Sequence, residues 1–252
     1  MNLRFIVSLV FIVSTFVSTS GYTSDITFTV GTTSWYNRYV PISRIEGTDS
    51  PGASYGLMYG PVVNVGSQEW NVVAQYLLSS GDYDIISPNT LVKVHHADAD
   101  SQATRRDIDV ILSHTISRNT SLTVGYKGIF VDDNISLTYS DKKSSARRSE
   151  IYNNGTMGIR GTIPLFQKVI LTTNGYGIAG KFHNDVTYPP GYKRLNEAPY
   201  NAFAWGAGAD AKITYSITHG LLAEVGMKFQ YIKSGSDNSN FGGPTVGIAY
   251  RF

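Results

Sequence analysis

The chain has 252 residues, of which 42% are hydrophobic and 16% are charged, with a formal net charge of +2 and no cysteine. The lack of cysteine excludes a disulfide framework, a cysteine-based zinc site and a cysteine nucleophile. A nearly balanced charge without a long basic run argues against a nucleic-acid partner. The 25 glycines and 17 tyrosines beside few charged residues are typical of neither a disordered chain nor a helical membrane protein.

The first residues have the pattern of a secretory signal peptide. Arg4 precedes an apolar stretch, residues 5–17, which only three small polar residues interrupt, and small residues follow at 18–20. The stretch is shorter than the roughly 20 apolar residues that a membrane-spanning helix needs. We therefore expect residues 1–20 to be a cleaved signal peptide and residues 21–252 to form the mature domain.

Beyond the signal, the chain repeats segments in which apolar and polar residues alternate with a period of two. In one of them Phe203, Trp205 and Ile213 fall on one face, while Asp210 and Lys212 fall on the other. Such alternation predicts strands, and no later stretch is apolar enough for a membrane helix. The predicted strands are residues 26–36, 53–65, 69–79, 105–117, 121–131, 154–165, 168–180, 201–215, 220–232 and 243–252.

The connections between these strands alternate between short turns and long polar segments. The turns fall at 66–69, 117–121, 165–168 and 216–220, and the loops at 40–52, 80–104, 132–153, 180–200 and 233–242. Membrane barrels have short periplasmic turns, long extracellular loops and an even number of strands. We expect an all-β fold, an antiparallel up-and-down transmembrane β-barrel of ten strands. Eight strands remain an alternative if two segments are not strands, and twelve if hairpins within the second and third loops also cross.

The last predicted strand ends on Tyr250, Arg251 and Phe252. Together with the signal peptide and the alternating connections, this end resembles Gram-negative outer-membrane β-barrel proteins. The resemblance implies a place in the cell outer membrane, with its lipid and lipopolysaccharide as partners. It also implies insertion by the barrel-assembly machinery, for which Tyr250 and Phe252 would form the assembly signal.

The alternation also predicts which charged side chains enter the bore. Acidic and basic residues are almost equal in number there, and isolated charges in a narrow interior are costly, so we expect paired networks. Two states of the bore remain open, a plugged one and a narrow, weakly selective pore. The predicted lumen charges are Asp107, Asp109, Lys127, Arg160, Asp210, Lys212, Glu224 and Lys228, with Arg251 as a further candidate.

The loops carry one arrangement that would suit an enzyme. Asp82 and Asp84 match in spacing and place an acidic pair of the omptin proteases, which resemble this chain in strand number and activate water with Asp and His residues at the outer rim. His183 and Asp185 lie in the loop of the omptin Asp and His pair, but in reversed order. The resemblance implies a rim protease as an alternative function, with the His as general base.

The other polar groups of the loops are not interpreted as a catalytic or metal site. The cluster of His95, His96, Asp98 and Asp100 is interpreted as a solvated loop, because adjacent strand residues point to opposite sides. We predict no metal and no cofactor, and we assign no catalytic residue. The preferred function is non-enzymatic, a small or plugged pore or a surface-exposed interaction protein. A basic set could meet lipopolysaccharide phosphates: Lys142, Lys143, Arg147, Arg148, Lys193 and Arg194.

Overall fold

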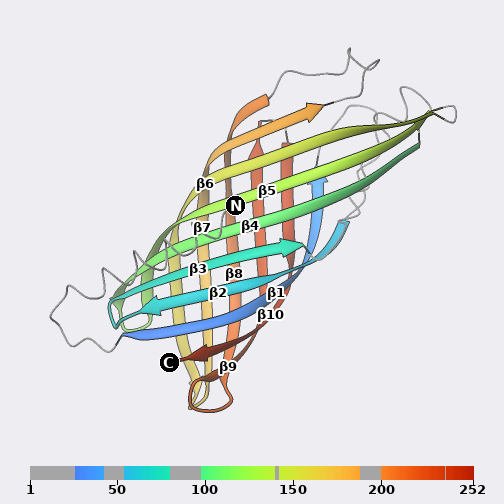
Figure 1. Cartoon of the computed structure of the whole chain (residues 1–252). Coiled ribbons are helices and arrows are strands. Elements are labelled where there is room, and N and C mark those ends of the chain that lie inside the picture. Colours follow the sequence, from blue (N-terminus) through green and yellow to red (C-terminus); the bar gives the residue numbers. More distant parts are fainter. Residues whose placement is uncertain (1–25, 43–53, 80–97, 140–141, 188–199, 236) are drawn as a thin grey trace.

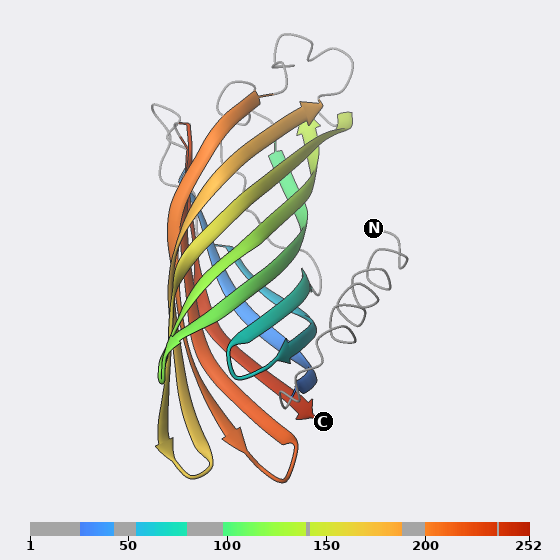
Figure 2. The same ribbon diagram turned by 90° about the vertical axis from the view of Figure 1, so that its left-hand side faces the viewer.

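A computed structural model describes residues 26–42, 54–79, 98–139, 142–187, 200–235 and 237–252. These residues form ten strands in one closed antiparallel barrel, in which each strand pairs with its sequence neighbours and β1 pairs with β10 (Figures 1 and 2). The prediction of ten strands is confirmed, and the alternatives of eight and twelve are wrong. The strands are β1 (Thr27–Ile42), β2 (Ser54–Gly66), β3 (Trp70–Ser79), β4 (Asp98–Ser117), β5 (Thr120–Tyr139), β6 (Lys142–Phe166), β7 (Val169–Thr187), β8 (Tyr200–Ser216), β9 (Leu221–Ser234) and β10 (Asp237–Arg251).

The two faces of the barrel wall differ in polarity. In β8, Phe203 and Trp205 are 65% and 49% exposed, whereas Ala204 between them is fully buried. Large apolar side chains cover the outside in the same way on the other strands, among them Leu122, Met157 and Val225. An apolar exterior is the arrangement of a barrel whose outer face contacts lipid. No helix in the described part of the chain has the length and apolar character needed to cross a membrane.

The short turns and the C-terminus lie at the same end of the barrel. The turn between β8 and β9 is closed by a 2.9 Å hydrogen bond from Ile217 N to Leu221 O, and Gly220 in this turn has a φ of 99°, which glycine adopts without strain. Phe252 N donates to Phe28 O at 2.8 Å, which closes the seam between β1 and the end of the chain. In outer-membrane barrels the short turns are the periplasmic ones.

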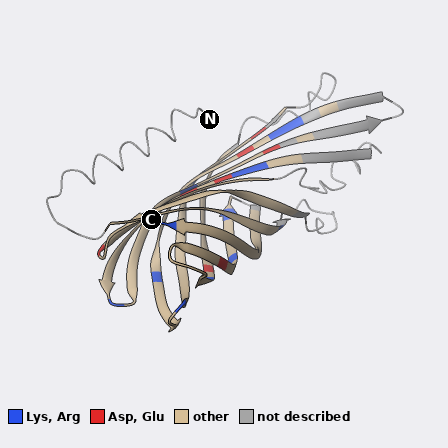
Figure 3. Ribbon diagram, turned by 60° about the horizontal axis from the view of Figure 1, so that its bottom comes forward, with Lys and Arg blue, Asp and Glu red and all other residues tan. Residues whose placement is uncertain are grey.

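Four strands, β4 to β7, are longer than the predicted ones and project well beyond the ends of β2 and β3 (Figure 2). Residues 132–153, predicted as a loop, are almost entirely strand, with Asp132 opposite Ser149 and Thr138 opposite Lys143. The prediction failed because a strand that leaves the lipid no longer needs an apolar outer face. Figure 3 shows acidic and basic residues close together on the projecting strands.

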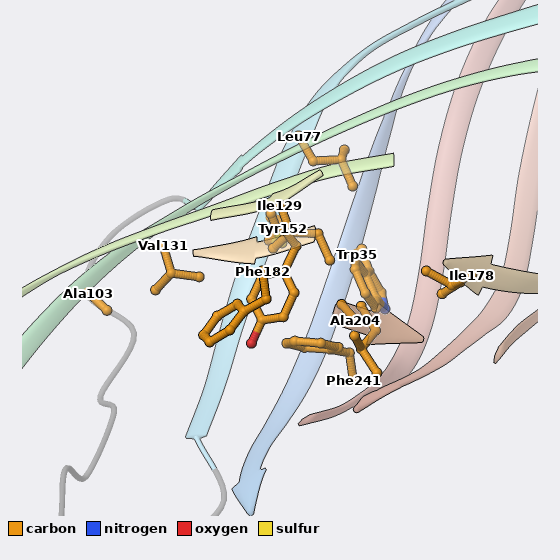
Figure 4. Packing of buried hydrophobic residues seen from close by; sticks show 12 residues of the cluster. Trp35, Leu77, Ala103, Ile129, Val131, Tyr152, Ile178, Phe182, Ala204 and Phe241 are labelled. Carbon is orange, nitrogen blue, oxygen red and sulfur yellow. The ribbon is translucent and has the colours of Figure 1, made fainter. Parts of the chain in front are cut away.

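The half of the barrel interior away from the short turns holds a cluster of buried apolar side chains. Trp35, Met58 and Phe182 are at most 1% exposed, and Tyr152 packs its ring against Phe182 with 4.6 Å between the ring centroids (Figure 4). Inward side chains from all ten strands join this cluster, which we call the plug. Its members are Trp35, Met58, Leu77, Ala103, Ile129, Val131, Tyr152, Ile178, Phe182, Ala204, Ile232 and Phe241.

The predicted signal peptide, residues 1–20, lies outside the described residues.

Candidate functional site

A buried ion pair sits within the plug. Asp107 accepts hydrogen bonds from Arg105 Nε and Nη2, both at 2.7 Å, and the two side chains are 1% and 3% exposed. The guanidinium lies 4.0 Å from the ring centroid of Phe241 on β10 and 5.3 Å from that of Trp35 on β1. A planar guanidinium suits both contacts, since it bonds a carboxylate in bidentate fashion and stacks on aromatic faces. The pair therefore links β4 to the far side of the barrel.

A second ionic group crosses the bore below the plug. Asp109 on β4 forms ion pairs with Lys127 on β5 and with Lys228 on β9, the latter at 2.9 Å. In the ring of ten strands, β4 and β9 are five places apart and so belong to opposite walls. Lys228 Nζ also lies 4.8 Å from the ring centroid of Trp35. Side chains from opposite walls thus meet directly, and we call Asp109, Lys127 and Lys228 the crossbar.

Neutral contacts extend the crossbar. Gln230 Nε2 donates to the hydroxyl of Tyr176 at 2.9 Å, joining β9 to β7. The Tyr176 ring lies against β8 at Gly208, where a Cβ would be 2.3 Å from the ring. Glycine at this inward position lets the tyrosine lie flat against the wall.

The remaining predicted lumen charges also point inward and lie nearer the short-turn end. Lys212 pairs with Glu224 at 2.9 Å, and Asp210 accepts a hydrogen bond from Asn174 Nδ2 at 3.2 Å. Arg160 lies opposite Asn174 in the register of β6 and β7. The structure thus brings the eight residues into one interior, in groups rather than in a single network.

Sequence reasoning missed three charged residues of the interior. Arg105 has the same parity as Asp107, so the alternation could have identified it. Arg148 and Glu150 form an ion pair at the outer end of β6, inside a stretch that was predicted to be a loop. No periodic signal marked that stretch, because its outer face is polar.

Between the crossbar and the short-turn end the barrel encloses a cavity of about 370 Å³. Its walls differ in charge. Strands β6 to β9 provide Arg160, Asp210, Lys212 and Glu224, whereas β1 to β3 provide uncharged side chains: Thr29, Thr33, Val62, Asn64, Asn71, Val73 and Gln75. Trp35 and Leu77, both members of the plug, line its inner end.

The residues of the protease hypothesis are not gathered in this interior. Phe182 points into the plug, so its neighbour His183 points to the outside of the wall, as does Asp185. His183 Nδ1 is hydrogen-bonded to Asn201 Oδ1 at 2.9 Å. Asp82 and Asp84 lie outside the described residues. The half of the arrangement that the structure describes therefore gives no support to the omptin roles.

Other polar groups of the rim are dispersed. Arg147 is on the outer face and pairs with Asp132 at 3.5 Å, whereas Arg148 turns inward. Among the described residues no group of three or more His, Asp or Glu side chains could hold a metal ion. His95, His96, Lys193 and Arg194 lie outside them.

No protein-family model matches the sequence, and no curated protein matches it. Among solved structures, the outer membrane protease OmpT from Escherichia coli superposes with a TM-score of 0.56, at 12% identity, over 93% of this chain and 99% of that chain. The chain has the fold of an outer-membrane β-barrel. Matches of lower TM-score include the translocator domain of the autotransporter NalP from Neisseria meningitidis, with 12% identity, 99% of this chain, 95% of that chain and a TM-score of 0.46. Neisserial surface protein A gives 10% identity, 89% of this chain, 97% of that chain and a TM-score of 0.37.

Proposed function

We propose that this outer-membrane β-barrel is a closed, non-enzymatic protein that acts through its surface-exposed end and does not conduct solutes. The observation that carries the proposal is the 2.9 Å contact between Asp109 and Lys228, which joins opposite walls of the bore. A narrow barrel is nearly filled by its own side chains, and a continuous water path cannot pass through a layer of direct contacts.

The plug adds a second barrier in the direction of the outer surface. Its apolar side chains leave ions no groups to replace their hydration shell, and the Arg105 and Asp107 charges are bonded to each other. An ion would have to pass both the plug and the crossbar.

An interaction role is supported by the projecting strands. On their outer face Arg106 and Arg147 both pair with Asp132, and Ser149 donates a hydrogen bond to the same carboxylate. These side chains are partly exposed and lie on hydrogen-bonded strands. A polar surface held on a paired strand framework suits contact with lipopolysaccharide headgroups or with a protein.

Planar-bilayer recording tests the closed state. The purified protein should give no stable current steps. A W35A/F182A/K228A variant loses the two largest fully buried side chains and the contact between opposite walls. It should give transient openings, which would prove that insertion of the protein is detected. Large, stable, ion-selective steps from the unaltered protein would refute the proposal.

A rim protease is the second candidate, because the fold is similar to that of OmpT. The assay is cleavage of a quenched fluorescent peptide mixture by the purified protein in lipopolysaccharide-containing micelles. We expect no cleavage. Cleavage that disappears in both D82N and H183A would replace the non-enzymatic proposal with the protease.

A further inference from the structure

Two of the ladders between neighbouring strands of the barrel wall are interrupted. The ladder between β2 and β3 skips Gly60 and Pro61, and the ladder between β1 and β10 skips Gly243 and Pro244. The register is the same on both sides of each break. In the part of the chain that the structure describes, no other ladder skips a pair without a shift of register. Both breaks therefore fall on a Gly-Pro dipeptide.

Proline causes both breaks, because it has no N–H group to donate. Each strand residue of an antiparallel sheet exchanges hydrogen bonds with only one of its two neighbouring strands, and the side alternates along the strand. Pro61 keeps its pair with Thr32 of β1, and Pro244 keeps its pair with Met227 of β9. The nitrogen of Pro61 therefore faces β3 and that of Pro244 faces β1, so each of these ladders lacks one hydrogen bond.

The two breaks lie on either side of β1 and β2, which we call the β1–β2 unit. Within the unit the pairing is continuous from Thr27 to Tyr39. Beyond its break, β2 keeps only two pairs with β3 in the direction away from the short turns. At the short-turn end, β2 and β3 are joined by a turn in which Ser67 N donates to Trp70 O at 2.7 Å. The unit is thus firmly held at the short turns and weakly held to β3 at its other end.

The interior does little to hold the unit by charge. Its described inward side chains are uncharged, whereas the ion pairs of the interior join residues of β4, β5, β8 and β9. Trp35 is its contact with these groups, since the ring centroid lies 4.8 Å from Lys228 Nζ and 5.3 Å from the Arg105 guanidinium. Movement of the unit would withdraw Trp35 and leave the crossbar in place.

The cavity lies directly behind both breaks. Val62 and Gln75 are opposite each other beside the break between β2 and β3, and both line the cavity. Trp35 and Thr245 have the same relation beside the break between β1 and β10. If the strands part at these places, the cavity opens sideways to the lipid that surrounds the barrel.

We propose that the β1–β2 unit is a lateral gate in the barrel wall. It parts from β3 and from β10 as one body, while the pairing between β1 and β2 stays intact, and it opens the cavity to the bilayer. The missing proline hydrogen bonds make this motion easier than the opening of any unbroken ladder, because local openings involve the least stable contacts. The crossbar lies on β4, β5 and β9 and does not move, so the open gate does not conduct ions through the bore.

Amide hydrogen exchange of the intact protein in detergent micelles, resolved by residue with NMR, tests the gate. Thr33 lies opposite Gly60 and bonds to β2, whereas Thr32 and Ser34 bond to β10. After correction for intrinsic rates, Thr32 and Ser34 should exchange about tenfold or more faster than Thr33. Neighbouring amides in the middle of β5, which has unbroken ladders there, should exchange alike. Equal rates for the three β1 amides would overturn the proposal.

Restoring the missing donors tests the cause of the motion. P61V/P244V supplies both N–H groups and should slow the exchange of Thr32 and Ser34 by roughly twofold to tenfold, which corresponds to the net free energy of one hydrogen bond. P164V is the control, because Pro164 keeps its pair with Ile170, and its rates should equal those of the parent. Unchanged rates in P61V/P244V would overturn the role of the prolines.

An engineered disulfide tests whether the unit moves as one body, and the chain has no cysteine that would compete. V62C/Q75C joins β2 to β3 beside the break. Once oxidised, it should slow the exchange of Thr32 and Ser34 at the other break by about tenfold or more. V30C/V63C joins β1 to β2 inside the unit and should leave these rates as in the parent. The gate is refuted if oxidised V62C/Q75C exchanges like the parent, and this comparison holds even if the proline variants do not fold.

Discussion

Substitution of Asp107 by Asn should cost this barrel a large part of its stability. Both Asp107 oxygens accept hydrogen bonds from Arg105 at 2.7 Å, and the side chains are 1% and 3% exposed, so water screens the charges very little. Removing one partner of such a buried pair costs about 3–5 kcal/mol, because the other charge is left in an apolar environment. The expected loss in free energy of unfolding for D107N is therefore about 3–5 kcal/mol.

An exposed pair on the next residue provides the matched control. Arg106 pairs with Asp132 on the outer face, where the side chains are 39% and 26% exposed. The D132N variant should lose at most about 1 kcal/mol, as exposed ion pairs do. The double variant R105M/D107L should regain most of the stability lost in D107N, since replacing a buried pair by apolar side chains is often neutral.

The measurement is urea-induced unfolding of the barrel reconstituted in lipid vesicles, followed by tryptophan fluorescence. The urea concentration at the midpoint of unfolding should be highest for the parent, lower for D132N and lowest for D107N. The midpoint of R105M/D107L should lie above that of D107N. If D107N and D132N have the same midpoint, or if the double variant is less stable than D107N, Arg105 and Asp107 do not form a buried pair inside a closed barrel.

Three further predictions use other parts of the wall and the interior. Val225 is 54% exposed on the outer face of β9, four residues after the strand begins at Leu221. V225R should lower the free energy of unfolding from vesicles by about 2–4 kcal/mol, and T172R, which alters a residue of the cavity, should lower it much less. Equal losses would mean that the two faces are exchanged. D109N leaves two lysines without their carboxylate and should lower the melting temperature more than K228M, which leaves Asp109 its pair with Lys127; the opposite order would contradict the crossbar. Phe252 contacts Tyr250 and Phe28, and F252A should reduce the amount of folded barrel in the outer membrane of an expressing cell, measured by its heat-sensitive migration on a gel; an unchanged amount would exclude it as an assembly signal.

The strands inside the lipid could be predicted closely from the sequence. The segment predicted at 201–215 is β8, Tyr200–Ser216, because lipid outside and a crowded polar bore inside impose an alternation on every residue. Residues 142–153 of β6 lack that alternation. They continue the strand through backbone pairing with β5 and β7, which is a tertiary property that local periodicity does not record.

The contents of the bore were predictable only in part. Parity placed Asp109 and Lys228 on inward faces, but it could not tell that they meet, because that depends on the diameter of the closed ring and the stagger of opposite strands. The cavity could not be predicted from the alternation of residues either. Its asymmetry arises because β6 to β9 and β1 to β3 are brought face to face only by closure of the barrel.

The most direct test of the account is quenching of single tryptophans by brominated lipids. Variants that keep only Trp205, only Trp70 or only Trp35 are reconstituted in vesicles that contain dibrominated phosphatidylcholine. Trp205 and Trp70 are 49% and 47% exposed on the outer face, whereas Trp35 is 1% exposed inside. Strong quenching of the first two with an unaffected Trp35 is the predicted result. Quenching of Trp35 as strong as that of Trp205 would contradict a barrel with lipid outside and a closed interior.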